Sequence, residues 1–165
     1  MRSTLFRKGL WIAALPLFFQ IVFVALTGYL MRQYARINAQ NIQTQEIVQT
    51  AEQVLHLLVN AETGARGYTL TDNAAFTEPF WNSDRDLPST MSKLRGLVDE
   101  STDDRLAVAE IQRHADIVME RHRSLIELVK SGHQEEAIAH ITTGEGKRRM
   151  DAARDVILGL TARLD

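Results

Sequence analysis

The sequence predicts an all-α protein: an antiparallel four-helix bundle preceded by one N-terminal transmembrane helix that continues into the first bundle helix. Three observations lead to this prediction. Apolar residues recur at steps of three and four, which is the spacing of one face of a helix. No segment shows the period of two that a strand requires. A run of 23 uncharged residues lies between Lys8 and Arg32.

The uncharged run, residues 9–31, is long enough to cross a bilayer. As a helix it would extend about 34 Å, against roughly 30 Å for the hydrocarbon core. Pro16 and Gln20 interrupt the run, but single residues of these types are tolerated in spanning helices. Trp11 and Tyr29 lie near its ends, where aromatic rings favour the membrane interface.

A cleaved signal peptide is the alternative interpretation of this run. Such a peptide has an apolar region of about 7 to 15 residues, followed by a cleavage site between small residues. The observed run is longer, and Ala25-Leu26-Thr27 is a weak match to a cleavage site. The length therefore favours a retained anchor.

The basic residues beside the run predict its orientation. Three precede it and only two, Arg32 and Arg36, follow it before residue 66. Basic residues favour the cytoplasmic side, so we expect the N-terminus inside the cell. We expect the chain to cross the inner (cytoplasmic) membrane once and to contact its lipid. The predicted parts are a cytoplasmic N-terminus (1–8), a transmembrane helix (9–31) and an extracytoplasmic helical-bundle domain (32–165).

Four apolar stripes predict the bundle helices, and a short helical piece at residues 134–141 precedes the last one. The stripes are Ile47, Ala51, Val54, Leu58, Ala61, Ala65 and Tyr68; Phe80, Asp84, Leu87, Met91, Leu94 and Val98; Val108, Ile111, Ala115, Val118, His122, Leu125 and Val129; and Met150, Ala153, Ile157, Leu160 and Leu164.

Local signals predict where these helices end or bend. Pro88 falls inside the second stripe and predicts a kink or a break near Leu87. The segment Ser101-Thr102-Asp103-Asp104 offers an N-cap and a first-turn carboxylate for the third helix. Gly132 is expected to stop that helix.

Charge and composition exclude several classes of function. All 21 acidic residues lie beyond Arg36 with 14 of the 19 basic ones, so residues 37–165 carry a net charge of −7. An acidic domain without a basic stripe is a poor nucleic-acid binder. The sequence has no cysteine, which excludes disulfides, thiolate nucleophiles, cysteine-bound zinc and covalently attached haem.

The histidines do not show the spacing of a metal site, and we expect no metal and no cofactor. Bundles that hold two iron ions use Glu-x-x-His motifs, whereas Glu110/His114 and Glu136/His140 are four residues apart. His122 lies on an apolar stripe, and we expect it to be a hydrogen-bonded core residue. A membrane-tethered helical haem- or metal-binding protein is kept as the alternative function.

The sequence also predicts no catalytic site, so the chain is not expected to be an enzyme. It contains no G-x-S-x-G elbow and no phosphate-binding glycine loop. Paired carboxylates such as Asp103 and Asp104 are adjacent, so they point to different sides of a helix and are better explained as caps or solvated groups.

The stretch ETGARGYTLT, residues 62–71, combines several unusual features. Glu62 and Arg66 have the spacing and order of a helical ion pair. Gly64 and Gly67 permit either close approach of another backbone or the end of the helix. Tyr68 continues the apolar stripe. We expect a clamped corner between two helices, with Thr71 or Asp72 capping the second.

This stretch and a second motif resemble the type-3 CHASE domain, an extracytoplasmic sensory module of bacterial histidine kinases, cyclases and chemotaxis-type receptors. The resemblance covers about residues 40–165. It departs at Thr69, where the family often has Leu, at Asp72-Asn73, where Gly-Asp is common, and at Ala153, where a larger aliphatic residue is usual. The matching residues are Glu62, Thr63, Gly64, Arg66, Gly67, Tyr68, Leu70, Thr71, Glu78, Pro79 and Phe80, and then Gly146, Lys147, Met150, Asp151 and Arg154.

The resemblance implies a sensor domain that passes a conformational signal along its helices to a cytoplasmic output module, in a receptor of the two-component type. We expect the Glu62–Arg66 corner and Lys147, Asp151 and Arg154 to couple the helix ends. A homodimer is expected, and the small-molecule or protein stimulus is undefined. A stand-alone structural anchor is the remaining alternative.

Overall fold

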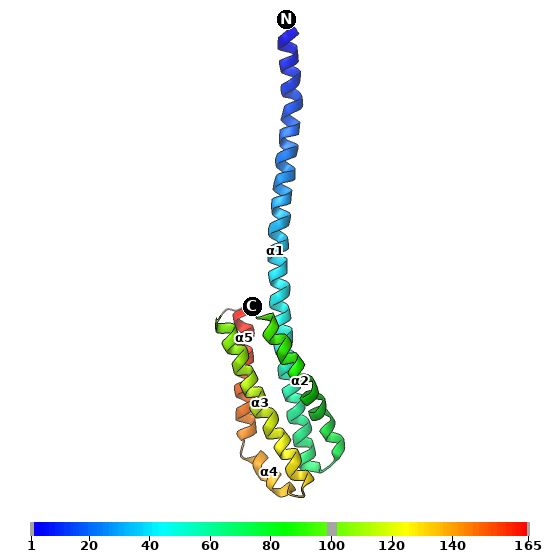
Figure 1. Ribbon diagram of the computed structural model, residues 1–165, viewed down its shortest axis with the longest axis vertical. Helices are drawn as coiled ribbons and strands as arrows, with labels where there is room; N and C mark the ends of the chain where they lie inside the picture. The colour runs from blue at the N-terminus through cyan, green and yellow to red at the C-terminus, as the bar shows by residue number, and fades with distance from the viewer. Residues whose placement is uncertain (1, 99–101, 165) are drawn as a thin grey trace. The chain divides into compact units, whose positions relative to one another are not determined.

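The computed structural model describes the backbone of residues 2–98 and 102–164, and the side chains of residues 17–34, 42–98 and 103–164. Over these ranges the chain forms helices and no strand, so the predicted all-α class is confirmed. The helices are α1 (Arg2–Thr71), the short 3-10 helix η1 (Ala74–Thr77), α2 (Glu78–Leu97), α3 (Thr102–Lys130), α4 (Gln134–Thr142) and α5 (Glu145–Leu164) (Figure 1).

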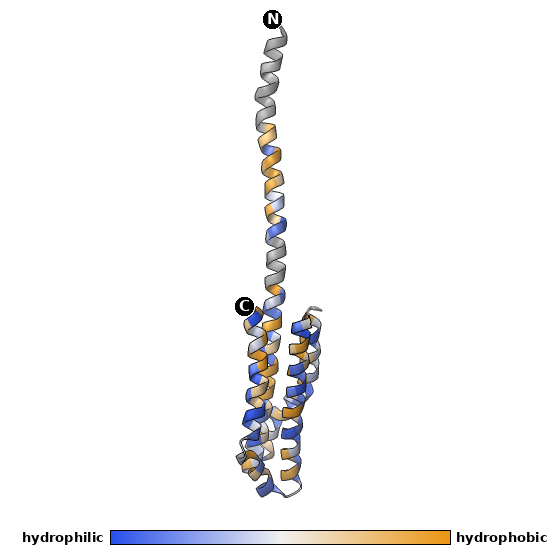
Figure 2. Cartoon of the chain, turned by 90° about the vertical axis from the view of Figure 1, so that its left-hand side faces the viewer, coloured by the Kyte–Doolittle hydropathy of each residue, from blue (hydrophilic) through white to orange (hydrophobic). Residues whose placement is uncertain are grey.

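The chain divides into two units, residues 1–42 and 43–165. In the first unit α1 presents a long run of exposed apolar side chains between Leu17 and Met31 (Figure 2). Within the described part of the chain, no helix combines the length and apolar composition that a membrane crossing requires. The side chains of residues 9–16, the first part of the predicted span, lie outside the described residues.

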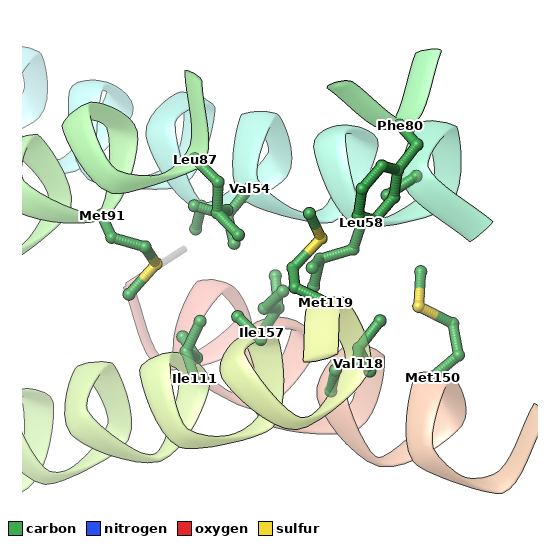
Figure 3. Packing of buried hydrophobic residues seen from close by; sticks show 14 of the residues in the cluster. Val54, Leu58, Phe80, Leu87, Met91, Ile111, Val118, Met119, Met150 and Ile157 are labelled. Carbon is green, nitrogen blue, oxygen red and sulfur yellow. The ribbon is translucent and has the colours of Figure 1, made fainter. Parts of the chain in front are cut away.

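The second unit holds one hydrophobic core, to which α1, α2, α3, α4 and α5 all contribute buried residues. Along its length α3 packs against α5, and it also contacts α2 and α4 (Figure 1). Val54 and Leu58 of α1 point toward Leu87 of α2 and Ile157 of α5 in the centre of this core (Figure 3).

The four predicted stripes are largely the residues that the core buries. Every member of the first and third stripes is less than 9% exposed. Two predicted members differ. Leu164 is only half-buried near the end of α5. Asp84 is half-buried because its carboxylate accepts a 2.7 Å hydrogen bond from Arg123 of α3, which joins α2 to α3.

Pro88 does not break α2, which continues from Glu78 to Leu97. Proline removes one backbone donor from the helix, but the buried residues Leu87 and Met91 on either side stay on the core face. Packing of that face holds the helix together across the proline, as is usual for an amphipathic helix in a protein. The break, one of the two predicted outcomes, is therefore wrong, whereas the kink stays a prediction.

The end of α3 follows the predicted glycine signal. Gly132 has a φ of 85°. Its N–H donates to Val129 O at 2.9 Å, and the N–H of His133 donates to Leu128 O at 2.9 Å. These two bonds form a Schellman motif, in which glycine adopts the left-handed conformation at lowest cost. The predicted N-cap of α3 at Ser101 and Thr102 lies outside the residues whose side chains are described.

The predicted corner between the first two bundle helices is present, and the glycines act there through close approach. Helix α1 does not end at Gly64 or Gly67 but continues to Thr71. A Cβ atom on Gly64 would lie 2.9 Å from both Phe76 O and Phe80 N, and one on Gly67 would lie 2.7 Å from the Phe76 ring. The backbones of α1 and of the η1–α2 segment therefore meet directly.

The predicted caps at Thr71 and Asp72 are wrong, because another residue makes the turn. The Asn73 side chain accepts a hydrogen bond from Ala75 N at 3.0 Å and caps η1. Thr71 is the last residue of α1, and its hydroxyl accepts from Asn73 N at 3.2 Å. Asp72 has a φ of 51°, the left-handed conformation in which glycine is favoured and Asp is tolerated.

Trp81 lies on the outer side of this corner. Its ring packs edge-on against Phe80, with centroids 4.9 Å apart. The ammonium group of Lys130, the last residue of α3, lies 5.0 Å from the Trp81 ring. Such a cation–π contact is worth about 0.5–1 kcal/mol at an exposed site, and it connects the start of α2 to the end of α3.

We expect Gly64, Gly67 and Gly159 to respond differently to replacement by alanine. At Gly64 the new methyl group would meet backbone atoms that cannot rotate away, so Gly64→Ala should lower the free energy of unfolding by about 1–3 kcal/mol. Gly67→Ala should cost less, because the half-exposed Phe76 ring can move. Gly159→Ala in α5, with no described neighbour within 4 Å, should stabilise the protein by about 0.5–1 kcal/mol. Chemical denaturation of the three variants measures this order, and a neutral Gly64→Ala would contradict the close approach.

Candidate functional site

The two sequence motifs, about 80 residues apart in the chain, line one cavity of about 420 Å³ between α1, α3 and α5. We call it the motif cavity. Seven of the twelve predicted site residues lie in its wall. The lining consists of Glu62 and Arg66 from α1; Arg121, His122 and Leu125 from α3; Ile141 from α4; Gly144; and Gly146, Lys147, Met150, Asp151 and Arg154 from α5.

The α1 side of the cavity carries the predicted ion pair. Arg66 Nη1 donates to Glu62 Oε1 at 3.2 Å, one helical turn away. The Arg66 side chain is 51% exposed, whereas that of Glu62 is 19% exposed. An ion pair this accessible contributes little to stability, so most of the Arg66 guanidinium is available to the cavity.

The α5 side carries a carboxylate shared by two cations. Asp151 accepts hydrogen bonds from Lys147 Nζ and, at 3.1 Å, from Arg154 Nη1. The hydrogen bond from Lys147, helped by the charges of Lys147 and Arg154, lowers the pKa of Asp151. All three residues lie on α5, so these bonds do not themselves join two helices. Their predicted role in coupling helix ends stays a prediction.

Arg121 of α3 connects the cavity wall to two other helices. Its Nη1 donates to Glu145 Oε2 of α5 at 3.3 Å, and its Nη2 donates to the backbone oxygen of His140 in α4 at 2.7 Å. The side chain is only 18% exposed. Gly146 lies against it, since a Cβ atom there would be 3.3 Å from Arg121 Nε. The glycine of the second motif thus leaves room for this arginine.

His122 forms part of the cavity wall on the core side and is 4% exposed. Its Nδ1 atom is buried and has no hydrogen-bond partner among the described residues. The expectation that it is a hydrogen-bonded core histidine is therefore wrong for this atom. Burial, followed by the positive charges of Arg121 and Arg66, lowers the pKa of His122 from 6.5 to about 4. The ring is neutral at pH 7.

The remaining predicted site residues lie at the corner and do not line the cavity. Gly64 is buried against the η1–α2 backbone, and Pro79 occupies the first turn of α2, where a missing N–H has no cost. Tyr68 is 7% exposed, and burial together with the Asp72 charge raises the pKa of its phenol. The first motif therefore both closes the corner and reaches the cavity.

Comparison with known protein families assigns this chain to one of them. The model of the CHASE3 domain matches residues 37–165. The chain belongs to the CHASE3 domain family. CHASE3 domains are extracytoplasmic sensory domains of signalling receptors. No curated protein and no solved structure matches the chain.

The histidines of this CHASE3 domain are not gathered for metal binding. Glu110 lies 3.8 Å from His114, which is buried, and Glu136 lies 4.0 Å from the exposed His140, each pair within one helix. No group of three or more potential metal-ligating side chains is found in the described part of the chain.

Sequence reasoning missed the polar contacts that join the helices of the CHASE3 domain. Besides Arg121, the side chain of Gln134 in α4 donates to Thr69 O at 3.0 Å. Thr69 O belongs to the last turn of α1, where carbonyls have no partner within the helix. Helical spacing can identify pairs on one helix, but neither Arg121 nor Gln134 has a partner at such a spacing.

Replacing His122 with leucine should stabilise the CHASE3 domain and change its pH dependence. The variant removes a buried unpaired polar atom, which costs about 1–3 kcal/mol. In the wild type, the folded pKa lies below the unfolded one, so stability is complete above about pH 6.5 and falls as the pH drops toward 4, by on the order of 3 kcal/mol. The stability of the His122→Leu variant should not show this part of the decrease at low pH. Urea denaturation of both proteins at pH 7 and pH 4.5 checks it, and an identical pH dependence would contradict the assignment.

Replacing Arg66 with alanine should leave stability almost unchanged. The ion pair with Glu62 is on the surface, and such pairs contribute about 0–1 kcal/mol. The midpoint of thermal unfolding should therefore differ from wild type by no more than a few degrees. A much lower midpoint of thermal unfolding would contradict this prediction and would show that Arg66 holds the corner together.

Proposed function

We propose that this chain is the membrane-anchored, extracytoplasmic sensor domain of a bacterial signal-transduction receptor. The observation that carries the proposal is membership of the CHASE3 family over residues 37–165. The convergence of both motifs on one cavity supports a role in detecting a stimulus, since ligand sites are typically concave and partly apolar. The domain itself would be non-catalytic, and an output module such as a kinase or cyclase would do the chemistry.

The anchor in this proposal is residues 9–31, with residues 1–8 in the cytoplasm and residues 32–165 outside. The support is the uncharged run of 23 residues and the exposure of its described apolar side chains. Phe18, Phe19 and Phe23, for example, are 62–69% exposed. Contiguous apolar surface of this kind marks contact with a membrane or another protein. Location in the inner membrane follows from this arrangement.

In the proposed architecture α1, α2, α3 and α5 form an antiparallel four-helix bundle, and α1 continues from it into the anchor. The support is the shared core and the assignment of Arg2–Thr71 as one helix. A stimulus that repacked the cavity would move α1 relative to α5. Shifts of about 1–2 Å between packed helices are enough to switch such proteins.

We include a homodimer in the proposal. Leu106 of α3 and Leu158 of α5 are 63% and 53% exposed, and α3 packs along α5. A second copy of the domain would cover these two exposed leucines. Dimers are the commonest symmetric assembly of soluble proteins, and a two-fold receptor would let one domain's movement act on its neighbour.

A reporter fusion tests the proposed topology. An enzyme that is active only outside the cytoplasm is fused after Asp165, and in a matched control the same enzyme is fused after Lys8. We expect activity only from the first fusion, because the uncharged run would carry everything after it across the membrane. A stably expressed but silent Asp165 fusion would contradict the proposal.

A further inference from the structure

We propose that the motif cavity binds a small organic carboxylate, with the acid group held by Arg66 and Arg154 and the apolar part lying against Leu125, Ile141 and Met150. As the identity of a stimulus, this inference rests on the sensor function proposed above. As a statement about binding, it can be tested alone.

The charge of the cavity is the first argument. Four of its lining residues are cationic (Arg66, Arg121, Lys147 and Arg154), and two are carboxylates (Glu62 and Asp151). The lining residues therefore have a surplus of two positive charges, one of which is matched by Glu145, the partner of Arg121, although residues 37–165 as a whole carry −7. A concave cationic wall in an acidic domain concentrates anions at that place.

Apart from Arg121, which pairs with Glu145, the cations of the cavity are not fully neutralised by their existing ion pairs. Asp151 is shared between Lys147 and Arg154, so one negative charge faces two positive ones. Arg66 contacts Glu62 through one nitrogen, Nη1, and a guanidinium has five donors. Arg66 and Arg154 are 51% and 43% exposed. Accessible pairs are weak, so the carboxylate of a ligand can accept from both arginines without an expensive rearrangement.

His122 supplies a second, independent observation. It is 96% buried, it lines the cavity, and its Nδ1 atom has no partner among the described residues. An unpaired buried polar group is destabilising, and such groups call for a functional explanation. The unpartnered Nδ1 atom is itself buried, so it can bond a polar ligand in the cavity only after the imidazole ring turns toward that ligand.

The start of α5 adds to the preference for an anion. Gly146 and Lys147 belong to the first turn of this 20-residue helix and line the cavity. First-turn N–H groups have no partner within their helix, and the positive end of the helix dipole lies there.

Size and apolar lining favour an organic ligand. The volume of about 420 Å³ lies within the range of small-molecule sites and far exceeds that of a single inorganic ion. Leu125 and Met150 are buried to 4% and 2% exposure and form the apolar part of the wall with the half-buried Ile141.

The test uses the full 165-residue chain purified in a mild detergent, and measures its thermal unfolding with benzoate and succinate as probes. Benzamide at the same concentration and sodium chloride at the same ionic strength are the controls for apolar binding and for screening. We expect at least one carboxylate to raise the unfolding midpoint in a saturable way, and neither control to do so.

Two matched variants locate the effect. Arg154→Gln removes a cavity cation that pairs with an aspartate on its own helix. Arg85→Gln removes the same type of pair, with Asp86, from α2 outside the cavity. The apparent carboxylate affinity should fall at least about tenfold in Arg154→Gln and stay unchanged in Arg85→Gln.

Three outcomes would overturn the inference: no carboxylate-specific rise, an equal rise in both variants, or stabilisation by inorganic phosphate without stabilisation by either carboxylate. These are distinct from failure of the proposed function. A silent reporter fusion with intact carboxylate binding would remove the sensor topology and leave the site in place. If no carboxylate binds but the Asp165 fusion is active, the carboxylate site is contradicted and the proposed topology stands.

Discussion

At Gly64 the backbone of α1 lies against the backbone of the η1–α2 segment, with no space for a methyl group. This contact fixes where α2 begins relative to α1, and it brings Phe80 into the core at 0% exposure. The turn between them is then short enough for Asn73 to cap η1 and for Asp72 to take the left-handed conformation. The position of the core stripe of α2 follows from this closed corner, because a shift of α2 along α1 would separate facing residues such as Leu58 and Phe80.

Helical spacing predicted the buried residues well, because burial depends mainly on which face of a helix a residue occupies. The end of α3 was also predictable, since Gly132 adopts a conformation that other residues rarely take. The misses have different physical origins. Pro88 was tolerated because packing outweighs one lost hydrogen bond. The Asn73 cap depended on the path of the turn, and Arg121 depended on the relative register of three helices, which no single-helix pattern contains.

The sequence named seven of the twelve residues that line the motif cavity, and it did not give their arrangement. Both motifs were identified by resemblance, and spacing alone gave the Glu62–Arg66 pair. The sequence did not show that both motifs line one cavity together with Arg121 and His122 of α3. The first motif has two physical tasks, since Gly64 and Gly67 pack against the corner while Glu62 and Arg66, only one or two residues away from them, line the cavity. His122 shows that such a site lowers the stability of the domain, because a buried imidazole nitrogen without a hydrogen-bond partner is destabilising.

The surroundings of Trp81 have an optical consequence. The chain contains two tryptophans, and this one packs edge-on against Phe80 while Lys130 at the end of α3 lies over its ring. Indole emission responds to nearby charge and to hydration. With Trp11 changed to phenylalanine, a single tryptophan would remain, close to the turn between α1 and α2, and its emission wavelength and lifetime would report the opening of that turn in real time without any attached dye.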